Sequence, residues 1–97
     1  MPPPLFIPLR TAFFNAFAAG RKRIEHRPYG CRWNERVCFV GRRVVISHGY
    51  SGRRLHGRVS DFHISTKPTR SAEWRSCYGV TGPIAAACIV ITLQGGS

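Results

Sequence analysis

The chain has 97 residues, 43% of them hydrophobic, which suits one domain with a modest core and excludes a largely disordered chain. Fifteen Lys and Arg against four Asp and Glu give a formal net charge of +11, so the expected partner is a polyanion, most commonly nucleic acid. No apolar run reaches transmembrane length, so no membrane partner is expected.

Thirteen of the fifteen basic residues are Arg, whose planar guanidinium group binds phosphates and base edges and stacks on rings. This preference is typical of nucleic-acid contact. An arginine-rich codon usage explains the excess of Arg over Lys equally well, although it does not explain the shortage of acids.

The first predicted elements are a short strand and a compact helix. Residues 1–4 (MPPP) are expected to form a flexible tail, because prolines lack a backbone donor, and residues 5–7 (LFI) a short strand. The stretch TAFFNAFAAG, residues 11–20, is typical of a helix. Thr11 suits the N-cap, and Gly20 suits the left-handed position that follows the last turn.

The same helix should place its aromatic residues against the core. Phe13 and Phe17 stand four residues apart on one face, with Phe14 beside them. Residues 21–26 (RKRIEH) then predict a short extended segment with Ile24 pointing inward. The turn signal RPYG ends that segment.

The second half of the chain predicts mainly strands. Residues 32–40 are ambiguous between helix and strand, whereas the β-branched run VVI at 44–46 is typical of a buried strand. Residues 53–65 alternate, with Leu55, Gly57, Val59 and Asp61 on one side and polar residues mostly on the other. The continuously apolar run IAAACIVITL, residues 84–93, predicts a central strand.

Residues 66–83 are rich in Pro and Gly at both ends and are interpreted as a loop, and residues 95–97 as a flexible end. One helix near the start and about five strands predict an α+β fold. We expect a small mixed barrel or half-barrel that forms a single domain over residues 5–94. A monomer is the default expectation.

The four cysteines give no metal-binding spacing. Cys31, Cys38, Cys77 and Cys88 form no CxxC pair, and no His lies at ligand spacing from them, so we expect neither a metal nor a cofactor. Cys38 and Cys88 lie in apolar runs, where reduced cysteines pack as small hydrophobes. With no convincing secretory signal, free thiols indicate a cytoplasmic protein, although residues 1–19 also have a composition compatible with a mitochondrial presequence.

The most basic segment contains one of the few acids. Glu25 lies between Lys22 and Arg27, just after the predicted helix end. A bend after Gly20 would bring Lys22 and Glu25 to the same side, and Glu25 would then hold both cations in fixed positions beside a ligand. A solvated surface ion pair is the competing explanation for the same residues.

The stretch PLRTAFFNAFAAGRKRIEHRPYGCRW resembles the start of ASCH domains, which belong to the PUA-like superfamily. Their opening strand and helix lead into Gly-x-Lys-x-x-Glu-x-Arg, which reads here as Gly20, Lys22, Glu25 and Arg27. ISHGYSG, RVSDFHI and AACIVITL resemble later elements, so the similarity spans residues 5–94. It implies a small PUA-like β-barrel of about five strands with the N-terminal helix packed across it. It further implies an RNA- or modified-nucleotide-binding cleft that contains Lys22, Glu25 and Arg27.

We call Lys22, Glu25 and Arg27 the trio, and further candidate contacts follow them in the sequence. In one branch of the family an aromatic residue and an Arg three positions later follow the turn, as Trp33 and Arg36 do here. Arg36 is a candidate phosphate contact, and Trp33 and Tyr50 are candidates for base stacking, although both also suit simple packing. A basic rim for backbone contacts is predicted from three arginines, Arg53, Arg54 and Arg58. Charge that protects an edge strand explains the rim equally well.

The leading interpretation is a binding module without chemistry, and the alternative is a small hydrolase. Some ASCH relatives are amidohydrolases of an acetylated cytidine nucleoside, and others are linked to ribonuclease activity. The amidohydrolases carry a Thr nucleophile where Glu25 stands and a further Glu on a later strand, so this sequence departs from them at the nucleophile. For RNA cleavage, Glu25 would accept the 2′-hydroxyl proton while Lys22 or Arg27 stabilised the phosphorane.

Overall fold

The computed structural model describes residues 2–78 and 85–94. Their strands are β1 (Leu5–Leu9), β2 (Ile24–Pro28), β3 (Arg43–His48), β4 (Arg54–Ser65) and β5 (Ala86–Leu93). The helices are α1 (Thr11–Ala18) and α2 (Ala72–Tyr78), with a 3₁₀ turn at Pro68–Arg70. This is a small α+β domain, as the sequence predicted, but it has two helices rather than one.

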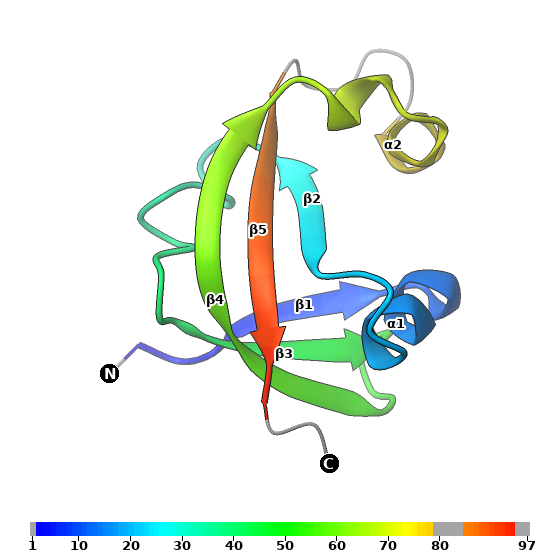
Figure 1. Ribbon diagram of the computed structural model, residues 1–97, viewed down its shortest axis with the longest axis vertical. Helices are drawn as coiled ribbons and strands as arrows, with labels where there is room; N and C mark the ends of the chain where they lie inside the picture. The colour runs from blue at the N-terminus through cyan, green and yellow to red at the C-terminus, as the bar shows by residue number, and fades with distance from the viewer. Residues whose placement is uncertain (1, 79–84, 95–97) are drawn as a thin grey trace.

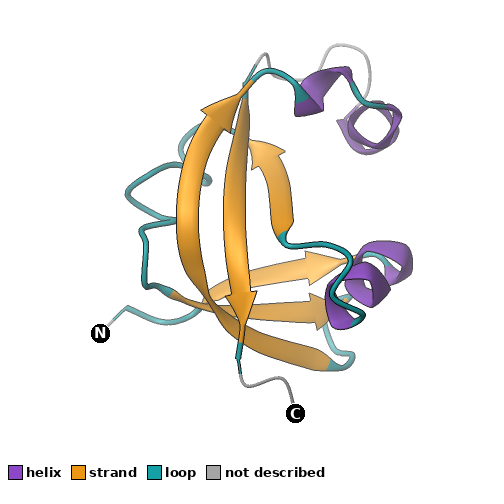
Figure 2. Cartoon of the chain, in the orientation of Figure 1, coloured by secondary structure: helices purple, strands orange, loops and turns teal. Residues whose placement is uncertain are grey.

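The five strands form one mixed sheet in the order β1-β3-β4-β5-β2. β1 pairs with β3 in parallel and the other neighbours are antiparallel. The sheet curls into a half-barrel, with both helices on one side (Figures 1 and 2). β5 lies inside the sheet between β4 and β2, which confirms the prediction of an interior C-terminal strand.

Helix α1 ends as its sequence predicted and begins differently. Gly20 has φ +78°, the left-handed conformation that suits glycine after a helix. Thr11 is the first helical residue and not the N-cap; Arg10 precedes it in an extended conformation without a side-chain cap. Thr11 Oγ1 lies 2.8 Å from His48 Nε2, so its hydroxyl is engaged with β3 instead of capping the helix.

The main core lies inside the curve of the sheet. Phe14 and Phe17 of α1 are buried there, whereas Phe13 is only half-buried at the edge of the cluster. Cys38 is buried in this core, and Cys88 is buried in a second, smaller cluster. Both cysteines therefore pack as the small hydrophobes that the sequence predicted.

Strand β2 has both faces covered, which corrects the expected orientation. Glu25, not Ile24, is its buried residue, with 6% of its surface exposed. Ile24 is half-buried against the second cluster, where Trp74 of α2 packs on Ala86 and Cys88 of β5. The second helix covers the face that a single-helix fold would have left open.

A bulge in β4 corrects the predicted alternation. Val59 pairs with Ile91 and Asp61 pairs with Val90, so Ser60 is an extra residue between them. Beyond the bulge the faces exchange: Phe62 packs against the core and Asp61 is exposed. Strict alternation of side chains along residues 53–65 had placed Asp61 on the core side.

The loop predicted for residues 66–83 was wrong over residues 68–78, which contain the 3₁₀ turn and α2. Ser71 Oγ accepts a hydrogen bond from the Trp74 backbone N at 3.1 Å, an N-cap contact that starts α2. The loop predicted at 79–83 and the flexible end at 95–97 lie outside the described residues. The ambiguous residues 32–40 form turns, in which Asn34 Oδ1 accepts from the backbone of Arg36 and Val37.

Within residues 2–78 and 85–94, no helix has both the length and the apolar character needed to cross a bilayer.

Candidate functional site at the seam of the half-barrel

The two edge strands of the sheet, β1 and β2, are joined by a side chain. Arg27 on β2 donates from Nη2 to the Pro8 carbonyl oxygen on β1 at 2.9 Å. Its Nε donates to Glu25 Oε2 at 2.6 Å, so one guanidinium links the carboxylate and the opposite edge. We call this gap between β1 and β2 the seam.

Lys22 reaches Glu25 because the chain bends after α1. The backbone N–H groups of Arg21 and Lys22 both donate to the Ala16 carbonyl oxygen, at 2.9 and 3.1 Å. This folds the chain back over the helix end before β2 begins. Lys22 Nζ then lies 3.8 Å from Glu25 Oε1, so the predicted bend and the predicted trio are both present.

Each cation of the trio also lies over an aromatic ring. Lys22 Nζ is 5.5 Å from the centre of the Phe13 ring and 5.6 Å from that of Phe17. Arg27 Cζ lies 4.9 Å from the centre of the Trp33 ring. These cation–π contacts hold the two positive charges in place on either side of the carboxylate.

The trio lines a pocket of about 520 Å³, a typical size for a small-molecule site. The walls come from β1, α1, β2, the 3₁₀ turn and α2. The lining residues are Pro8, Leu9, Arg10, Phe13, Lys22, Glu25, His26, Arg27, Pro68, Ser71, Trp74, Cys77 and Tyr78. We call it the seam pocket.

The two oxygens of Glu25 have different surroundings. Oε2 accepts the short bond from Arg27, whereas the distance of 3.8 Å from Oε1 to Lys22 Nζ is too long for a hydrogen bond. Among the described residues, no donor hydrogen-bonds to Oε1. A carboxylate oxygen at a pocket wall with unused acceptor capacity is a ready contact for an N–H group of a ligand.

Two neutral polar side chains complete the walls. Burial lowers the pKa of His26, and the positive charges of Lys22 and His63 lower it further, so the imidazole is neutral at pH 7. Burial is the main cause that raises the pKa of the Tyr78 hydroxyl, which is therefore protonated. Both can hydrogen-bond to a ligand without adding charge.

Apart from Trp33, the other predicted site residues lie away from the trio. Trp33 contacts Arg27 but does not line the seam pocket, and Arg36 is exposed in the turns that follow it. Tyr50 is 79% exposed between β3 and β4. Arg53 Cζ lies 6.0 Å from the centre of the Phe14 ring.

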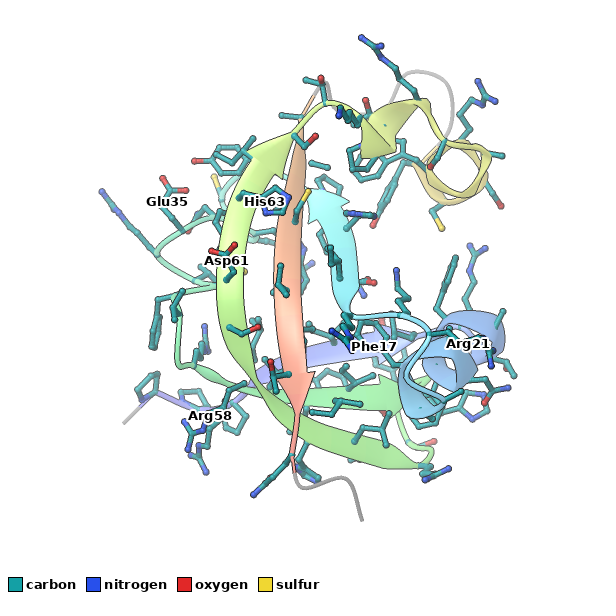
Figure 3. All side chains as sticks on the ribbon, in the orientation of Figure 1. Phe17, Arg21, Glu35, Arg58, Asp61 and His63 are labelled. Carbon is teal, nitrogen blue, oxygen red and sulfur yellow. The ribbon has the colours of Figure 1, made fainter. Side chains whose placement is uncertain are left out.

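The remaining two arginines of the predicted rim face away from the seam. Arg54 lies 5.2 Å from the centre of the Phe6 ring, and Arg58 lines a second pocket. Figure 3 shows Arg58 on the side of the molecule away from Arg21 and Phe17. The rim is therefore a separate surface and not the border of the seam pocket.

Sequence reasoning missed the wall contributed by α2. Residues 66–83 were interpreted as a loop, but Trp74 is buried in α2 and lines the pocket together with Tyr78. The signal that would have found this helix is Ser71, an N-cap residue three positions before Trp74. Arg10, His26 and Pro8 were also missed as lining residues.

Among the described residues, no group of three or more His, Cys, Asp or Glu side chains is placed to hold a metal ion. All four cysteines are free thiols, two of them buried and two exposed.

No model of a known protein family matches the chain, and a search among curated proteins gives no match either.

Proposed function

We propose that the chain is an RNA- or nucleotide-binding module that takes one nucleotide into the seam pocket. The observation that carries this proposal is the unused Oε1 acceptor of Glu25, held by two fixed cations at the wall of a pocket of about 520 Å³. The net charge of +11 independently favours a polyanionic partner.

Each part of a nucleotide has a complementary group in the pocket. Glu25 Oε1 can accept from an amino edge of a base, as carboxylates do. Lys22 and Arg10 line the same pocket and supply positive charge for a phosphate. The half-buried rings of Phe13 and Tyr78 offer faces on which a base can stack.

The resemblance to ASCH domains supports the same proposal. A curled sheet, a helix after the first strand and the Gly20–Arg27 motif at the seam are what a small PUA-like barrel would have. In this proposal α1 and the seam form the ligand cleft of such a domain. The wall provided by α2 then closes the cleft from the opposite side.

The test is the binding of fluorescently labelled short RNAs of single base composition, measured by anisotropy at about 50 and 200 mM salt. Glu25→Gln keeps an acceptor for Arg27 but removes the charge, so it should weaken binding of one base more than the others. Lys22→Ala should weaken binding of all RNAs and reduce the salt slope by about one.

Arg32→Ala is the matched control, because Arg32 is exposed and lines neither pocket. Thermal unfolding of each variant checks that the fold is intact. If folded Lys22→Ala and Glu25→Gln both bind RNA as tightly as the unchanged chain, the assignment of the seam pocket is wrong.

The second candidate function is a small hydrolase, which the Lys22–Glu25 pair at 3.8 Å inside a pocket favours. Incubation of the chain with RNA and with N4-acetylcytidine, followed by a search for cleaved RNA or released acetate, tests it. Product formation that Glu25→Gln abolishes would support the hydrolase. Folded protein that yields no product would exclude both reactions.

A further inference from the structure

The outward face of β1, β3 and β4 carries a surface that the seam pocket does not use. Leu5 and Ile7 of β1 and Val44 of β3 point into the core, so the residues between them point outward. The strand register places Phe6, Val45 and His56 side by side in one row. The next row holds Arg43, Arg58 and Thr92. We call these two rows, with Arg54 and Tyr50, the outer face.

One end of the outer face is an exposed aromatic cluster. Tyr50 is 79% exposed and Phe6 is 36% exposed, and their ring centres lie 6.3 Å apart. Arg54 Cζ lies 5.2 Å from the Phe6 ring centre, and Arg54 Nη2 donates to the Tyr50 carbonyl oxygen at 3.2 Å. Such rings are flat surfaces on which unpaired bases stack.

The other end is cationic, and none of the described side chains supplies a counter-charge there. Arg43 and Arg58 are directly opposite each other on neighbouring strands, an arrangement that is destabilising for like charges. Arg58 Nη1 donates to the Gly41 carbonyl oxygen at 2.9 Å, whereas the Arg43 side chain has no hydrogen-bond or ion-pair partner among the described residues. Both line a second pocket of about 490 Å³ together with His56 and Thr92.

Among the described side chains, no carboxylate forms an ion pair at this end of the face. The ion pairs found among the described residues are the two at Glu25 in the seam. Asp61 lies beyond the β4 bulge and forms no ion pair with Arg58 or Arg43. A bound phosphate between the two guanidinium groups would replace their repulsion by two attractive contacts.

We propose that the outer face is a second binding surface for single-stranded nucleic acid, separate from the seam pocket. Phe6 and Tyr50 stack on unpaired bases, while Arg43, Arg54 and Arg58 contact the phosphates. Arg54 and Arg58 are four residues apart on β4, about 13 Å, so a strand of a few nucleotides contacts both ends. This inference rests on the proposed function for the class of ligand, which is nucleic acid. The binding surface itself does not depend on the seam pocket.

The experiment compares two ligands, a labelled single-stranded RNA of about ten nucleotides and a labelled single nucleotide. Tyr50→Ala should weaken binding of the long RNA by about 5- to 150-fold, the usual effect of removing one stacking ring. Arg43→Gln should weaken it and reduce the salt slope by about one. Neither variant should change binding of the single nucleotide, which needs only the seam pocket.

Arg32→Gln is the matched control for loss of one exposed charge, and Glu25→Gln is the control for the seam pocket. One outcome is that folded Tyr50→Ala and Arg43→Gln bind the long RNA as tightly as the unchanged chain while Glu25→Gln binds it less tightly. In that case the outer face is not a binding surface, and the assignment of the seam pocket is kept. Weaker binding by Tyr50→Ala and Arg43→Gln, with unchanged binding by Glu25→Gln, supports the outer face as the binding surface and overturns the assignment of the seam pocket.

Two unlabelled competitors distinguish single-stranded RNA from other ligands that the outer face could bind. Duplex RNA of the same length that competes equally well would overturn the stacking role, because paired bases are not free to stack on Tyr50. An acidic peptide that competes equally well would overturn nucleic acid as the occupant and indicate an acidic protein surface. Preferential competition by single-stranded RNA supports the inference.

Discussion

Glu25 and its neighbours show how one carboxylate can organise a cationic pocket without neutralising it. Arg27 and Lys22 both lie within ion-pair distance of Glu25, and Arg10 lines the same pocket, so the cations outnumber the acid. Because Arg27 occupies Oε2, and Oε1 has no hydrogen bond among the described residues, the acid both positions the cations and presents a free acceptor to the seam pocket. A ligand that presents an N–H group and a negative charge satisfies both features.

His26 leads to a prediction for the pH dependence of stability. Its folded pKa lies below the ordinary value of 6.5, first because of burial and then because of Lys22 and His63. The unfolded chain therefore takes up a proton before the folded state does. The free energy of unfolding should be at its full value above about pH 6.5 and fall as the pH drops through the folded pKa. Urea unfolding at about pH 7.5 and 5.5 measures this difference, and His26→Gln should reduce it.

His63→Gln is the companion variant for that measurement. It removes one of the two positive charges that disfavour protonation of His26, so it should reduce the pH-dependent loss by less than His26→Gln does. Figure 3 shows His63 on β4, and the register places it across Cys88 from His26. An unchanged pH dependence in His26→Gln would show that other groups cause the acid destabilisation.

At the residue scale, the sequence predicted the members of the trio better than their surroundings. Gly20 and the spacing of Lys22, Glu25 and Arg27 are local features, so the bend and the ion pairs could be expected. The contact of Arg27 with Pro8 could not, because it depends on which strands form the two edges of the sheet. Pairing between distant strands has no local signature in one sequence.

At the element scale, strands with a uniform pattern were predicted and two irregular features were not. β3 and β5 are short apolar runs whose burial is evident from composition. The bulge between Val59 and Asp61 inserts a residue that a period of two cannot represent. Helix α2 has only seven residues, too few for a helical period to show, and its Ser71 cap was its clearest signal.

The close approach of β4 and β5 gives a prediction at this scale. A Cβ added to Gly57 would lie 2.5 Å from the Thr92 backbone oxygen, which cannot move without displacing β5. Gly57→Ala should therefore lower the free energy of unfolding by about 1–3 kcal/mol. Urea unfolding monitored by circular dichroism measures the change.

Gly30→Ala is the control for that substitution. A Cβ at Gly30 would meet nothing within 4 Å, so the same chemical change should stay within about 0.5 kcal/mol. Equal stability of Gly57→Ala and Gly30→Ala would mean that β5 can move away from β4 at little cost. The fixed geometry of the outer face, which includes Thr92 beside Arg58, would then be in doubt.

At the scale of the whole molecule, the open seam and the pocket have a common origin. The sheet curls without closing, and its two edges, β1 and β2, each contain a proline, Pro8 and Pro28. Proline is typical of edge strands, because it cannot donate to a ladder of hydrogen bonds. A side chain, Arg27, spans the edges instead, and the space beside it becomes the seam pocket.

This arrangement predicts that the charge of Arg27 is not sufficient for its role. Arg27→Lys keeps the positive charge but cannot reach Glu25 and the Pro8 carbonyl with a planar fork, and it loses the guanidinium contact with Trp33. We expect a loss of about 1–3 kcal/mol in the free energy of unfolding. Hydrogen exchange should accelerate most in β1 and β2, since these strands lose the link between them, and least in the paired interior of β4 and β5.

Arg32→Lys provides the control, because Arg32 is exposed and should tolerate the same exchange of side chains. Faster exchange in all strands by the same factor would show that Arg27 acts on global stability and not on the seam. Exchange rates and stability equal to those of the unchanged chain would show that the two edges stay together without Arg27. A local effect at β1 and β2 would establish that the same guanidinium that lines the seam pocket also links the two edges of the half-barrel. In the proposed function, ligand binding at Glu25 would then stabilise the seam as well.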